Sequence, residues 1–156
     1  MKFSPANPGF YARRVEVTIR RQLLGKASAG ITVTDAEVDA ALEKSRKRFN
    51  LTWEQFVEEQ KKKGETVEEA KAMLRTELAH EKWLRTEVNS KFTAATEAEL
   101  RSIYEKDKSK YGASFEESKD AIIKKRDGRV KQQLERQILD ELRKKANVKT
   151  FLPEQK

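Results

Sequence analysis

The side chains of this sequence that could do chemistry are numerous, but few of them are spaced for catalysis. There is no Cys and only one His, His80, which excludes thiolate chemistry and a metal site built from several histidines. We find no glycine-rich phosphate-binding motif, no zinc-protease motif and no nucleophile elbow. The sequence therefore predicts a protein that is not an enzyme, with no catalytic residues, no metal site and no cofactor.

The carboxylates and His80 suggest helix surfaces rather than a reaction centre. Carboxylates stand among basic residues at helix-face spacing, as in Glu77, Glu81 and Lys82, which is typical of a solvated helix face. His80 is the one side chain that titrates near neutral pH. We interpret His80 as a surface or semi-buried packing residue, with a pH-sensing role as the alternative.

Large apolar side chains are the other candidates for function, because methionine and aromatic residues can accept varied binding partners. The candidate residues for a client-binding or peptide-binding surface are Phe49, Trp53, Met73, Trp83, Phe92, Tyr104 and Tyr111. The competing interpretation is that most of these side chains belong to the core. Trp53 is the strongest candidate for exposure, because it starts a helix whose core contact Phe56 already supplies.

The elements that carry these residues are predicted to be helices. Hydrophobic residues make up 37% and charged residues 38% of the chain, with six Gly and three Pro, which favours long helices with solvated faces over a sheet protein. The central stretch, residues 66–88, has one apolar stripe with no Gly or Pro, and starts with a capping box, Thr66-x-x-Glu69. The same box starts four other segments, at Thr34, Thr52, Thr96 and Ser114.

The domain organisation follows from these signals. We expect helices over residues 10–27, 34–48, 52–64, 66–88, 96–110 and 114–146. Residues 1–9 are expected to be extended, residues 10–151 to form a single all-α domain, and residues 152–156 to be a tail. Within the domain, the long helix of the 113–151 segment should pack back on the helices of residues 10–112. The alternation in Val148–Phe151 favours a short terminal strand.

The charge is uneven along the chain, whose net charge is +8. Residues 1–33 carry six basic residues against one acidic, residues 119–149 carry 11 against five, and residues 34–118 carry 16 against 19. The basic ends should therefore meet the acidic middle, and could also attract nucleic acid or anionic lipid. No apolar run is long enough for membrane insertion, and the start, MKFSPANPGFYARR, lacks the apolar core of a signal peptide. Either the protein is cytoplasmic or a signal has been removed.

Three consecutive segments, GITVTDAEVDAAL (30–42), NLTWEQFVEEQKKKG (50–64) and VEEAKAMLRTELAHEKWLRTEV (67–88), resemble the N-terminal chaperone module of the SurA-like proteins. EAELRSIYEKDKSKYG (97–112) resembles the helix that leads into the parvulin-type prolyl isomerase domain of that family, and residues 113–151 resemble the helix and strand that follow it. The parvulin domain itself is missing between Tyr111 and Ser114, and residues 1–9 have no clear match to the opening strand of the family.

The resemblance implies an ATP-independent chaperone, a holdase, that shields unfolded or partly folded envelope proteins in the periplasm or another extracytoplasmic compartment, without prolyl isomerase activity. The alternative is a basic all-helical protein that binds nucleic acid or acts as a scaffold. Nucleic acid is the less favoured partner, because acidic residues are mixed into the basic 119–149 segment. The short Gly112–Ala113 connection also suggests a homodimer formed by exchange of the C-terminal helix.

Overall fold

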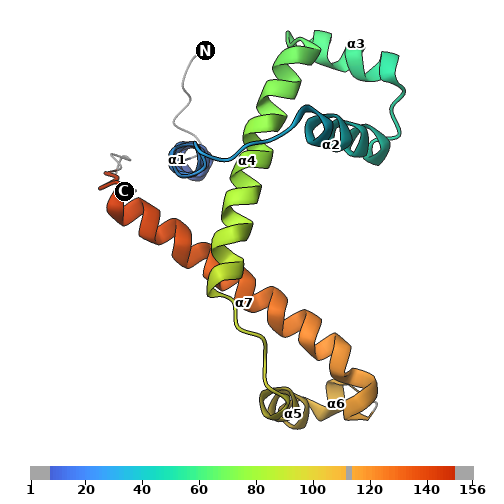
Figure 1. Cartoon of the computed structure of the whole chain (residues 1–156), viewed down its shortest axis with the longest axis vertical. Coiled ribbons are helices and arrows are strands. Elements are labelled where there is room, and N and C mark those ends of the chain that lie inside the picture. Colours follow the sequence, from blue (N-terminus) through green and yellow to red (C-terminus); the bar gives the residue numbers. More distant parts are fainter. Residues whose placement is uncertain (1–7, 112–113, 150–156) are drawn as a thin grey trace. The chain divides into compact units, whose positions relative to one another are not determined.

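The computed structural model describes residues 8–111 and 114–149 (Figure 1). These residues form seven α-helices and no strand: α1 (Pro8–Ala27), α2 (Asp35–Arg48), α3 (Trp53–Lys63), α4 (Val67–Lys91), α5 (Glu97–Lys106), α6 (Lys108–Tyr111) and α7 (Phe115–Lys145). The predicted all-α class is confirmed. Two compact units divide the chain inside α4: unit 1 ends at Arg85, and unit 2 runs from Thr86 to Lys149. The single domain expected for residues 10–151 stays a prediction.

All five predicted capping boxes form. In the first, the Thr34 N–H donates to Glu37 Oε2 at 2.9 Å, and the Glu37 N–H donates to Thr34 Oγ1 at 3.3 Å. The other four pair Thr52 with Gln55, Thr66 with Glu69, Thr96 with Glu99, and Ser114 with Glu117. Each box satisfies amide groups that the helix leaves without a partner, a contribution of about 1 kcal/mol for a typical cap.

The C-terminal ends of three helices turn through left-handed residues: Asn50 after α2, Gly64 after α3 and Asn147 after α7, with φ of 51°, 76° and 47°. The hydrogen bonds are those of the Schellman motif. After α7, for example, the Val148 N–H donates to the Arg143 carbonyl at 3.3 Å and the Asn147 N–H to the Lys144 carbonyl at 3.1 Å.

Four element boundaries differ from the predictions. Helix α1 begins at Pro8 rather than residue 10, since proline fits the first turn of a helix, where its missing N–H needs no partner; residues 1–7 lie outside the described chain. Helix α4 continues to Lys91. The helix expected over 96–110 is divided at Asp107, whose ψ is 29°. Val148 and Lys149 form no strand, because the Schellman motif holds the Val148 N–H; Thr150 and Phe151 lie outside the described residues.

Unit 1 is built from α1, α2, α3 and most of α4. Its buried apolar side chains are Leu23, Leu24, Val38, Leu42 and Phe56. Ion pairs join α2 to α4: Lys71 lies 2.8 Å from Asp39, Lys82 lies 2.6 Å from Glu37, and Arg75 contacts Asp35. The chain doubles back between α2 and α3, and α3 leads into α4 (Figure 1).

Unit 2 is built from α5, α6 and α7, with the end of α4. Its central cluster joins Leu100 and Tyr104 of α5 to Phe115 and Ile122 of α7. Salt bridges fix the register: Glu97 with Lys119 at 3.6 Å, Arg101 with Glu116 at 3.4 Å, and Lys91, the last residue of α4, with Glu141 at 3.0 Å. The long C-terminal helix α7 therefore packs back on α5 and the end of α4, as predicted. Its packing onto residues 10–85 stays a prediction.

Candidate functional site

Two aromatic side chains at the connection between α2 and α3 are exposed. Phe49, which follows the last residue of α2, is 66% exposed, and Trp53, the first residue of α3, is 45% exposed. Phe56, one turn after Trp53, is buried, and its ring centroid lies 5.6 Å from that of Trp53. Phe56 thus supplies the core contact of α3 and leaves Trp53 on the surface. We call Phe49 and Trp53 the aromatic pair.

The turn that carries the aromatic pair is held by a dense set of hydrogen bonds. The Leu51 N–H donates to the Arg46 carbonyl and the Asn50 N–H to the Lys47 carbonyl, both at 3.1 Å. The Arg46 guanidinium donates to the Leu51 carbonyl at 2.5 Å and to both oxygens of Glu43, at 2.6 and 2.9 Å. The Glu43 contact also raises the pKa of Arg46. A turn fixed in this way presents its side chains with little loss of freedom on binding, which favours affinity.

The other two candidates in unit 1 lie on α4. Met73 is 40% exposed, so its flexible thioether side chain can reach a partner. Trp83 is half-buried. Exposure therefore selects Phe49, Trp53 and Met73 from the four candidates of this unit.

The three candidates in unit 2 are more enclosed. Tyr104 is buried in the core, with its ring 6.3 Å from that of Tyr111 and edge-on to Phe115 at 5.8 Å. Phe92 is half-buried, and the Lys131 ammonium lies 4.7 Å from its ring centroid. The interpretation as core holds for Tyr104, whereas Tyr111 and Phe92 keep part of their surface.

His80 is a packing residue of unit 1, but it is buried rather than at the surface or semi-buried as predicted. It is 8% exposed, and its Nε2 is buried without a hydrogen-bond partner among the described residues. Gly25 of α1 lies against it: a Cβ on Gly25 would stand 3.7 Å from that Nε2. Burial lowers the pKa of His80, the positive charge of Arg21 lowers it further, and Glu77 opposes them.

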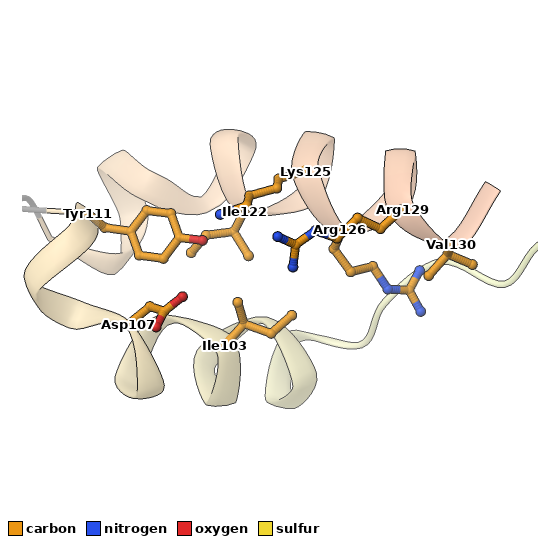
Figure 2. A pocket seen from close by; sticks show the side chains of 8 residues that line it. All are labelled: Ile103, Asp107, Tyr111, Ile122, Lys125, Arg126, Arg129 and Val130. Carbon is orange, nitrogen blue, oxygen red and sulfur yellow. The ribbon is translucent and has the colours of Figure 1, made fainter. Parts of the chain in front are cut away.

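One feature was not anticipated from the sequence, a cleft between α5 and α7 of about 210 Å³ (Figure 2). Its apolar wall is formed by Ile103, Ile122 and Val130, and its basic side chains come from Lys125, Arg126 and Arg129. The four-residue spacing of Lys125 and Arg129, which puts both on one face of a helix, was the available signal. That spacing alone does not reveal the cleft, because only the fold shows that α5 lies opposite these two residues.

The described residues contain no group of three His, Asp or Glu side chains that could hold a metal ion. None of their helices is long and apolar enough to cross a membrane. Comparison with protein-family models, with curated proteins and with solved structures found no match to this chain.

Proposed function

We propose that the protein is an ATP-independent chaperone that binds apolar segments of unfolded proteins, without enzymatic or prolyl isomerase activity. The observation that carries the proposal is the aromatic pair, two large apolar rings exposed on a hydrogen-bonded turn. Exposed aromatic side chains on a rigid support are typical of interaction surfaces. The resemblance of residues 30–88 to the SurA-like chaperone module supports the same function, and with it the proposal that the protein acts in the periplasm or another extracytoplasmic compartment.

The size of the aromatic pair indicates weak and reversible binding. An aromatic side chain buries about 150–250 Å² in full, so covering the exposed parts of two rings removes roughly 200 Å² from water. At about 25 cal/mol per Å², that is about 5 kcal/mol before the entropy cost of association. A holdase that releases clients without ATP needs such weak contacts, and the high charge of the surface keeps a loaded complex in solution.

The test is suppression of aggregation of an unfolded envelope protein, followed by light scattering. The double variant Phe49→Ser/Trp53→Ser should lose most of the protection. Val17→Ser is the matched control, because Val17 is 67% exposed on α1 and is also apolar. Equal protection by the original protein, the double variant and the control would refute the role of the aromatic pair.

The nucleic-acid alternative has less support, because several basic side chains of α7 already face rings or carboxylates. Lys119 pairs with Glu97, Arg126 with Asp127, and Lys131 covers Phe92. Tight, strongly salt-dependent binding of plain duplex DNA would favour the alternative.

We also propose that a homodimer can form by exchange of α7 between copies, since the contacts of α7 with α5 in one chain can be made by α7 of a second. Light scattering over a dilution series should show a dimer, and Gly112→Ala should change its fraction. A monomer mass at all concentrations, unchanged by the substitution, would refute the exchange.

A further inference from the structure

The cleft between α5 and α7 combines an apolar wall with an excess of positive charge. Ile103 of α5 faces Ile122 of α7, with Val130 at one end and the Tyr111 ring at the other (Figure 2). Ile122 is 1% exposed, so the cleft reaches the core of unit 2. An apolar group bound in the cleft would contact carbon atoms of both helices.

Three basic side chains and one carboxylate line the same cleft. Arg126 is already engaged, since its guanidinium donates to the Thr93 carbonyl at 2.7 Å and to Asp127 at 3.0 Å. Lys125 and Arg129 form no ion pair with any described residue. Asp107, the carboxylate, lies at the Tyr111 end of the cleft (Figure 2).

The cations around the cleft crowd one another. The Lys110 ammonium beside Lys125 lowers the pKa of Lys125, and burial and the Arg129 charge lower it further, while Asp107 opposes them. A carboxylate placed among Lys110, Lys125 and Arg129 would relieve this repulsion and accept charge-assisted hydrogen bonds.

The volume limits what the cleft can hold. About 210 Å³ is smaller than the 300–1,000 Å³ usual for sites that enclose a drug-sized ligand. It suits one or two side chains of an extended peptide. The apolar and basic side chains of the walls are complementary to an apolar side chain next to an acidic one.

We propose that this cleft binds a short peptide segment in which an apolar side chain stands beside an Asp or Glu. The apolar side chain contacts Ile103, Ile122 and Val130, and the carboxylate pairs with Lys125 and Arg129. The proposal rests on the proposed chaperone function and adds a preference among clients: the aromatic pair accepts apolar segments of any charge, and the cleft selects those that are also acidic.

The test is fluorescence anisotropy with labelled peptides of Gly and Ser that carry, at the centre, Leu-Glu, Leu-Lys or Ser-Glu. The Leu-Glu peptide should bind at least about tenfold more tightly than either of the others, because each of them lacks one of the two matching groups. Its affinity should also fall as salt is added. Equal binding of Leu-Glu and Leu-Lys peptides would overturn the proposal.

Matched variants test the site itself. Lys125→Gln/Arg129→Gln should weaken binding of the Leu-Glu peptide about tenfold or more. The control, Lys124→Gln/Arg136→Gln, removes the same charge from exposed positions of α7 outside the cleft and should bind within about twofold of the original protein. Equal losses of affinity in both double variants would show that the peptide is attracted by net charge alone and would refute the site. Circular dichroism of both double variants establishes that they fold.

The outcomes separate this proposal from the chaperone function. A protein that suppresses aggregation but does not bind the Leu-Glu peptide refutes the cleft and retains the holdase. A protein that binds the peptide through Lys125 and Arg129 but does not suppress aggregation supports the cleft and refutes the holdase.

Discussion

Two aromatic residues next to helix ends are buried in unit 2, and two are exposed in unit 1. In unit 2, Tyr104 and Phe115 are buried against each other, and Arg101 covers the Phe115 ring at 4.3 Å from its centroid. In unit 1, Phe49 and Trp53 stay on the surface although they flank a helix connection as Tyr104 and Phe115 do. The difference comes from the neighbouring helix: α7 packs against α5 and covers its aromatic residues, whereas in α3 the buried residues are Phe56 and Gln60, and Trp53 lies outside them. Aromatic residues near a helix connection are thus core in one unit and candidate binding surface in the other.

The largest expected effect tests this contrast directly. Ile122→Ala should lower the free energy of unfolding by about 2–5 kcal/mol, because it leaves a cavity in a buried cluster. Phe49→Ala should change it by only about 0.5 kcal/mol, since the ring is mostly in water. Urea unfolding followed by circular dichroism measures both. A loss from Phe49→Ala as large as that from Ile122→Ala would mean that Phe49 is a structural residue.

The next effect concerns the turn that carries the aromatic pair. Asn50 has φ of 51°, which asparagine and glycine tolerate better than other residues. Asn50→Ala should therefore destabilise the protein by about 1 kcal/mol, and Asn50→Gly should be close to neutral. If the fixed turn matters for binding, Asn50→Ala should also weaken protection against aggregation, and Asn50→Gly should not. Equal protection by both variants would show that the aromatic pair works without a rigid turn.

The parts of this molecule that could be predicted from the sequence are the local ones. A capping box needs only residues three apart, so all five were found, and the apolar stripes gave the helices. The Schellman turn at Asn147 is equally local, but asparagine is a weaker signal than glycine, and the alternation in Val148–Phe151 predicts a strand instead. Exposure, in contrast, depends on tertiary packing. The sequence predicts Phe49 and Tyr104 equally as binding residues, and only the position of α7 over α5 shows that Tyr104 is buried. The cleft needs Ile103 and Lys125 on different helices, so no sequence spacing could define it.

A smaller effect is expected in acid, where the ion pair between Glu37 of α2 and Lys82 of α4 should be lost. The Lys82 ammonium, with the Thr34 N–H, lowers the pKa of Glu37 from 4.5 to about 2. The stabilisation by this carboxylate is complete above pH 4.5 and is lost as the pH falls toward about 2. Glu37→Gln should reduce the loss of stability over that range. Glu81→Gln, at an exposed neighbour of Lys82, is the control, and an equal reduction in both variants would refute the role of Glu37.

The smallest effect separates the two units by pH. The only histidine, His80, lies in unit 1, and so do both tryptophans, Trp53 and Trp83. Tryptophan fluorescence therefore reports on the unit that contains the titrating group. Arg21 of α1 and Glu77 of α4 are the charged groups that act on His80.

The direction of this effect follows from proton binding. The pKa of His80 lies below 6.5 in the folded protein because of burial, whereas an unfolded histidine titrates near 6.5. Between the two values the unfolded chain binds more protons, so the stability of unit 1 is complete above pH 6.5 and falls as the pH falls through this window. Urea unfolding followed by tryptophan fluorescence between about pH 5 and 8 should show that slope in the original protein. His80→Gln should flatten the slope of stability against pH. Arg21→Gln should change that slope less than His80→Gln does, because burial lowers the pKa of His80 more than the Arg21 charge does. If the original protein and His80→Gln have the same slope, the buried imidazole is not the group that makes unit 1 sensitive to acid.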